Sequence, residues 1–102
     1  TNMEVFFLPS ETIFLTFKLR NGSGWLTSHR LILCFHPPGR LEGSKPKEYF
    51  LKNFESAKIR GSALFVKFQG KNAKIILQVD LPSILQEIKD YLEEAAKNWK
   101  KL

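Results

Sequence analysis

The sequence predicts a mainly β domain, a seven-stranded antiparallel barrel or sandwich capped by one C-terminal α-helix. About seven short alternating or apolar segments are separated by turn residues, at the roughly 8–12-residue spacing typical of sandwiches and barrels. Only the end of the chain, from about residue 82 to 101, changes to the three- and four-residue period of an amphipathic helix. The 102 residues fit one domain that spans residues 1–102.

The first half of the chain contains three predicted strands. Residues 12–20 alternate, with Phe14 as the exception, which predicts a half-buried antiparallel strand. The cluster 21–24 predicts a turn, after which residues 25–27 pair back onto the first strand. In residues 30–35 the apolar face of Leu31 and Leu33 lies opposite a face with Ile32 and Cys34. This third strand is therefore expected near the middle of a sheet.

The second half contains a loop and four more predicted strands. Residues 36–47 hold three prolines and two glycines, which predicts a long loop. Strands are expected at 48–52, 53–60, 63–69 and 73–79. In residues 63–69, Phe65 and Lys67 alternate with the apolar Leu64, Val66 and Phe68.

The predicted helix has a marked start and an apolar stripe. Asp80 can cap it, Pro82 suits its first turn, and Ser83 with Gln86 has the spacing of a capping box. The stripe consists of Ile84, Leu85, Ile88, Leu92, Ala95 and Trp99. Because such a stripe must be buried, the helix is expected to pack against the open end of the β structure.

The net charge of +6 is unevenly distributed. Residues 1–79 contain twelve Lys/Arg and five Asp/Glu, a net +7, whereas residues 80–102 contain four and five, a net −1. A basic β region favours phospholipid headgroups, nucleic acid or an acidic protein as partner, and a charge that only keeps the domain soluble is the alternative. Because the basic residues are scattered over several strands, nucleic acid is the least expected of the three.

The remaining composition bears on localisation. A single cysteine excludes an internal disulfide and is compatible with a reducing compartment. No apolar run approaches the ~20 residues that cross a bilayer, and the N-terminal residues do not resemble a signal peptide. A cytoplasmic protein is expected, with peripheral membrane association if it binds lipid.

The segment GWLTSHRLIL, residues 24–33, resembles the hairpin of bacterial PH domains, GRAM domains and the GLUE domain of an ESCRT-II subunit. That hairpin reads leucine, threonine, two polar residues, then Arg-Leu-Ile. Residues 8–13, the order of elements and Trp99 in the last helix are also similar. The resemblance implies a PH-like fold and a non-catalytic adaptor module, part of a larger protein or complex.

The same resemblance implies a protein partner such as ubiquitin or ESCRT subunits, anionic membrane lipid, or both, in ESCRT-type sorting. A PH-like protein-interaction module without lipid or ubiquitin affinity is the alternative. A basic nucleic-acid-associated domain is the third interpretation.

Two groups of residues are candidate sites for lipid headgroups or other anions. In PH domains that bind phosphoinositides, the first turn and its flanking cations hold the phosphates, and here that turn has Lys18, Arg20, Asn21 and Ser23. The second group is the loop with Arg40, Lys45 and Lys47, where each cation near an anionic membrane contributes ~1 kcal/mol. A solvated strand face and a solvated loop are the alternatives.

Phe14 and Phe65 are the candidate protein-binding residues, because each points away from the apolar face of its predicted strand. Phe6, Phe7 and Trp99 are further candidates for partial exposure. A core position is the alternative for every aromatic, and it is preferred for Phe17, Phe35, Phe68 and Trp99.

Catalysis and metal binding are not expected, and no cofactor is predicted. Cys34, His29 and His36 are close in sequence but too few for a structural zinc site, and Cys34 lies in an apolar run. No nucleophile or phosphate-loop motif is present. Thr27 and Arg30 suit structural roles, with the Thr27 hydroxyl on turn amides and the Arg30 head group in water.

Overall fold

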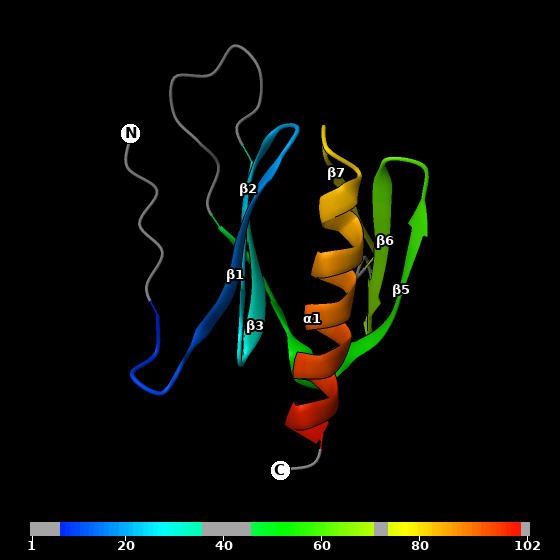
Figure 1. Ribbon diagram of the computed structural model, residues 1–102. Helices are drawn as coiled ribbons and strands as arrows, with labels where there is room; N and C mark the ends of the chain where they lie inside the picture. Colours follow the sequence, from blue (N-terminus) through cyan, green and yellow to red (C-terminus); the bar gives the residue numbers. More distant parts are fainter. Residues whose placement is uncertain (1–6, 36–45, 71–73, 101–102) are drawn as a thin grey trace.

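The computed structural model describes residues 7–35, 46–70 and 74–100, which form two antiparallel sheets and one C-terminal helix (Figure 1). The first sheet has the order β1 (Ile13–Leu19), β2 (Gly22–Thr27), β3 (Arg30–Phe35) and β4 (Lys47–Phe50). The second has the order β5 (Phe54–Arg60), β6 (Ala63–Phe68) and β7 (Lys74–Gln78). A 3₁₀ turn, η1 (Leu51–Asn53), joins the sheets, and α1 (Ser83–Lys100) follows β7. The predicted class, mainly β with seven strands and a terminal helix, is confirmed.

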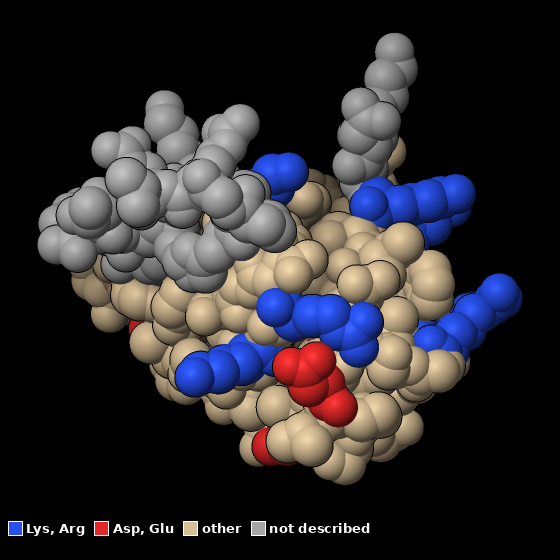
Figure 2. Space-filling model, turned by 90° about the horizontal axis from the view of Figure 1, so that it is seen from above, with Lys and Arg blue, Asp and Glu red and all other residues tan. Residues whose placement is uncertain are grey.

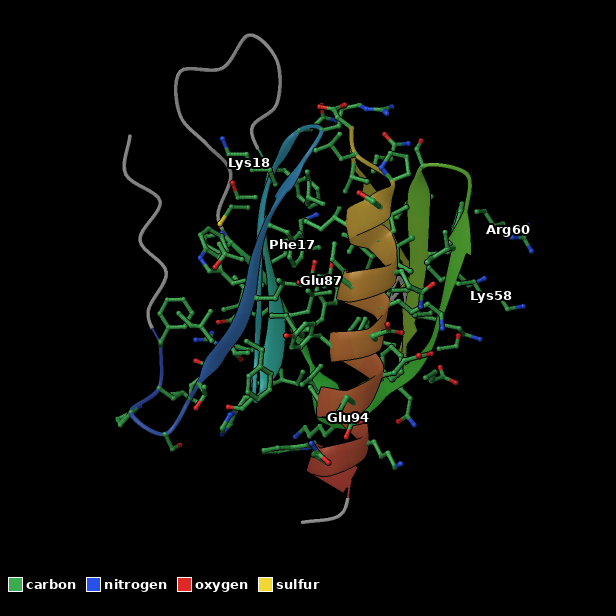
Figure 3. The ribbon with its side chains drawn as sticks, in the orientation of Figure 1. Phe17, Lys18, Lys58, Arg60, Glu87 and Glu94 are labelled. Carbon is green, nitrogen blue, oxygen red and sulfur yellow. The ribbon has the colours of Figure 1, made fainter. Side chains whose placement is uncertain are left out.

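The helix lies between the two sheets and packs against the inner face of each (Figure 1). Phe17 points from β1 toward α1 (Figure 3), and Leu85, Ile88 and Leu92 of α1 are fully buried. The backbone N–H of Arg20 donates to the carbonyl of Gln78 over 2.7 Å, which links the end of β1 to the end of β7. The core is therefore one apolar volume enclosed by two sheets and one helix.

Strand β3 is buried on both faces, as its sequence predicts. Leu31 and Leu33 belong to the core that faces the helix. Ile32 and Cys34 alternate with them and are also fully buried. A strand of this kind reads as a continuous apolar run rather than as an alternating one.

The first predicted turn is wrong in its position. The turn lies at Arg20–Asn21, and Gly22, Ser23 and Gly24 belong to β2. A Cβ at Gly22 would lie 2.0 Å from the carbonyl oxygen of Cys34, and one at Gly24 would lie 2.3 Å from the ring of Phe17. These glycines are required for close packing across the sheet rather than for a turn conformation.

Smaller differences occur at β4 and at the helix start. The predicted strand 48–52 ends at Phe50, because the next residues turn to bury Leu51 completely. The side chains expected to cap α1 have other partners: Asp80 accepts from Arg20, and Gln86 donates to Asp90.

Within the described ranges, no helix has the length and apolarity needed to cross a bilayer.

Candidate functional site

The Thr27–Arg30 turn is held by a buried network. The Thr27 hydroxyl oxygen accepts the backbone N–H groups of His29 at 3.1 Å and Arg30 at 3.0 Å. The same hydroxyl donates to Oε2 of Glu11 over 2.5 Å. The sequence-based role of Thr27, a hydroxyl bonded to turn amides, is confirmed.

The position expected for the Arg30 head group is wrong, because the residue is only 6% exposed. Its Nε donates to Glu11 Oε2 at 2.8 Å and its Nη2 to Glu11 Oε1 at 2.9 Å, a two-point ion pair. Nη1 donates to Glu48, and the Phe7 ring lies 5.9 Å from the guanidinium carbon. Two acids within reach made burial of this arginine possible, and sequence spacing alone did not show that they converge.

The Glu11 carboxylate is fully buried and ionised. Burial raises the pKa of this carboxyl, but hydrogen bonds from Arg30, Thr27 and the Leu8 backbone, together with the Arg30 charge, outweigh burial and bring it to about 2. The charges of this network are satisfied inside the protein. It is therefore a structural cluster and not a ligand site.

At the predicted anion site on the β1–β2 turn, one of the two cations, Arg20, already has partners within the protein. Lys18 is exposed opposite Ser23, and Asn21 is exposed in the turn. However, Arg20 Nε lies 3.2 Å from Asp80 Oδ1, and Nη2 donates to the Val79 carbonyl. Seen from above, this end of the molecule has scattered Lys and Arg side chains, and an acidic side chain lies against the central ones (Figure 2).

The second predicted anion group is not brought together with the first. Lys47 lies on β4, at the edge of the sheet opposite to β1. Arg40 and Lys45 lie outside the described residues, as does Phe6.

A cavity of about 400 Å³ lies between the β2–β3 turn and the end of α1. Phe14 lines it and is 40% exposed, as the sequence predicts, and the register of β1 against β2 shifts at this residue. The rings of His29 and Trp99 meet there with their centroids 5.0 Å apart. No Lys, Arg, Asp or Glu lines this cavity among the residues described.

Two nucleophile candidates in the described residues are poorly placed for catalysis. Ser28 Oγ lies 2.8 Å from Nδ1 of His29, but the same oxygen accepts the Thr12 backbone N–H at 3.0 Å, which ties it to the start of β1. Cys34 is fully buried, and burial raises the pKa of its thiol. No cluster of three or more metal-ligating side chains occurs within the described ranges.

The outer face of the β5–β6–β7 sheet gathers cations around two apolar side chains. The register places Lys58, Phe65 and Ile76 side by side in one row, and Ser56, Lys67 and Lys74 in the next. Arg60 follows Lys58 on β5, and both side chains point away from α1 (Figure 3). We call this surface the basic–apolar face; it consists of Ser56, Lys58, Arg60, Phe65, Lys67, Lys74 and Ile76.

The basic–apolar face contains a cavity of about 430 Å³. Phe65 and Ile76 line it and are 39% and 50% exposed. The exposure of Phe65 was expected, whereas Phe17 and Phe68 are buried and Phe35 and Trp99 partly buried against the core, also as expected. Acidic partners for the four cations are absent among the residues that the structure describes. The face therefore offers positive charge, without acidic partners in the described ranges, beside exposed apolar surface.

Sequence reasoning found Phe65 but missed the cations beside it. Their signal was present, because Lys58 and Arg60, and likewise Lys74 and Ile76, are two residues apart and so share a strand face. The sequence alone did not predict the strand register, which places residues of β5, β6 and β7 side by side across the sheet.

Comparison of the chain with models of protein families, with curated proteins and with solved structures finds no match in any of the three. The PH-like resemblance stays a prediction drawn from the sequence.

Proposed function

We propose that the chain is a non-catalytic binding module that holds an acidic protein partner on the basic–apolar face. The observation that supports this is the cavity lined by Phe65 and Ile76 and bordered by cations without acidic partners among the described residues. Exposed apolar side chains provide contact area, and the surrounding charges select an acidic surface and speed its association.

The shape of this face favours a protein over a membrane. A cavity accommodates a projecting side chain, whereas a bilayer presents a broad surface of headgroups. Lys18, the exposed cation of the expected lipid site, lies on the opposite side of the molecule from Lys58 and Arg60 (Figure 3). Membrane lipid is thus the weaker candidate.

We also propose that the fold is PH-like. The order of seven antiparallel strands followed by one C-terminal helix supports this, because it is the order of elements that the resemblance implies. Ubiquitin and ESCRT subunits are the first partners to try on this ground, and a PH-like module without affinity for either is the alternative. A cytoplasmic setting is part of this proposal.

The test is a pair of charge reversals on opposite sides of the protein. Lys58→Glu and Lys18→Glu change the net charge equally, and both positions are exposed. The labelled domain is titrated by NMR with ubiquitin, with a short peptide rich in Glu and Leu, and with vesicles of anionic lipid.

The proposal expects the peptide or ubiquitin to shift resonances of β5, β6 and β7, and Lys58→Glu to weaken binding at least about tenfold while Lys18→Glu leaves it nearly unchanged. Equal weakening by both variants would show attraction to overall charge alone and contradict the proposal. Vesicle binding that depends on Lys18 would favour the lipid site instead.

A further inference from the structure

One row of the basic–apolar face places two ammonium groups and one hydroxyl side by side. Lys67 of β6 is the direct cross-strand partner of Lys74 of β7, and Ser56 of β5 is the partner of Lys67 on its other side. All three are exposed. This row therefore presents three hydrogen-bonding groups with a total charge of +2 on one surface.

This arrangement is unfavourable for the protein alone. Like charges directly opposite on neighbouring strands destabilise a sheet by roughly 0.2–1 kcal/mol. Neither lysine forms an ion pair with an acid in the described part of the chain. A bound anion would remove the repulsion.

The charge and the donors match a phosphate monoester better than a carboxylate. A carboxylate carries one negative charge, so it neutralises only half of the pair. A phosphorylated side chain carries a charge of about −1.5 to −2 and three strong acceptor oxygens. Two ammonium groups and one hydroxyl, with a charge of +2, complement the charge and the acceptor oxygens of that group.

We infer that Ser56, Lys67 and Lys74 form a subsite for a phosphorylated residue of the protein partner. This inference rests on the proposed function, which supplies the partner. The neighbouring row lies two residues away along the strands, about 6.7 Å, and contains Phe65 and Ile76. An apolar residue next to the phosphorylated one would therefore lie on Phe65 and Ile76.

Single-stranded nucleic acid also supplies phosphates, but the face suits it less well. Such proteins stack successive bases on several aromatic side chains along a basic groove. The basic–apolar face has one aromatic side chain, Phe65, among its described residues, and its neighbour across β7 is the aliphatic Ile76.

The test uses three pools of immobilised peptides that share a randomised sequence with one fixed central residue. That residue is phosphoserine, serine or glutamate. Binding of the domain to each pool is measured by biolayer interferometry, together with a thymidine oligonucleotide. Lys67→Gln and Lys74→Gln remove the inferred subsite, and Lys58→Gln is the matched control on the same face.

We expect the phosphoserine pool to bind at least about tenfold more tightly than the serine pool, and also more tightly than the glutamate pool. Lys67→Gln and Lys74→Gln should abolish this preference, whereas Lys58→Gln should weaken all three pools by a similar factor. The conservative Lys74→Arg should retain the preference.

Two other outcomes are distinguishable. If all pools bind equally and Lys58→Gln still weakens them, the phosphate subsite is refuted while the proposed protein-binding function stands. If no pool binds, or if the oligonucleotide binds more tightly than every pool, the proposed function fails as well.

Discussion

Positive charge is used in two opposite ways in this molecule. The Arg30 guanidinium is buried and forms ion pairs with the buried carboxylate of Glu11 and with the partly exposed side chain of Glu48, so its charge is neutralised within the protein. Lys67 and Lys74 are exposed, face each other, and have no acid of the described chain beside them. Removing one partner from the first arrangement would leave a buried charge unpaired and destabilise the fold, whereas the second arrangement already weakens the isolated domain.

The difference between these regions separates residues that hold the fold from residues available to a partner. Substitutions in the Arg30 cluster should change the free energy of unfolding and act on binding only through it. Substitutions on the basic–apolar face should change binding and change the free energy of unfolding by no more than about 1 kcal/mol.

The largest effect is expected from Arg30→Ala. Removing this guanidinium leaves the Glu11 carboxylate buried without its partner, which costs roughly 3–5 kcal/mol of unfolding free energy in such pairs. Urea unfolding followed by circular dichroism measures it. Lys67→Ala, the control on the basic–apolar face, should stay within about 0.5 kcal/mol of the parent. A similar loss in both variants would erase the contrast.

Acid should destabilise the fold through Glu11. Its pKa is lowered from 4.5 to about 2 on folding. A carboxyl with a depressed pKa stabilises the folded state above the unfolded value, and this contribution disappears as pH falls from about 4.5 to about 2. The expected loss is roughly 3 kcal/mol over this window, because one pKa unit corresponds to about 1.4 kcal/mol.

Unfolding free energies measured between pH 5 and about 2 check this slope. Glu11→Gln should be less stable at neutral pH but flatter over the acid range. Glu94→Gln, which removes a carboxylate from the exposed side of α1 (Figure 3), is the control. An unchanged slope in Glu11→Gln would show that this carboxyl is not the group that titrates.

Thr27→Val should have an intermediate effect. Valine keeps the shape and removes the oxygen that accepts two backbone N–H groups and donates to Glu11. Leaving buried donors unpaired costs roughly 1–3 kcal/mol. Thermal unfolding compares this variant with Thr27→Ser, which keeps the hydroxyl and loses only the methyl group. A larger loss of stability in Thr27→Ser than in Thr27→Val would mean that methyl packing, and not the hydrogen bonds, dominates.

The sequence was sufficient for the fold class because its signals are local. The alternation in β1 and β6 involves residues two positions apart, and the apolar stripe of α1 involves residues three or four positions apart. The position of Gly22 and Gly24 in β2 was missed, since the close approach of Phe17 and Cys34 that requires them comes from other strands.

The candidate site depended more on contacts between distant segments. Phe65 was found because its exposure follows from alternation within one strand. Lys67 and Lys74 become a pair only through the β6–β7 register, and Glu11 meets Arg30 only through the folding of the chain before β1. The distance between the two residues along the sequence predicts neither of these contacts.

If the charges of the basic–apolar face serve a partner rather than the fold, Lys67→Glu should improve stability and impair binding. This change replaces a repulsive cross-strand pair with an attractive one, so the unfolding free energy should rise by about 0.2–1 kcal/mol. In the same variant, binding of the phosphoserine peptide pool should fall by at least about tenfold. A variant that is less stable than the parent by more than about 1 kcal/mol, or that binds the pool as well as the parent does, would contradict the claim.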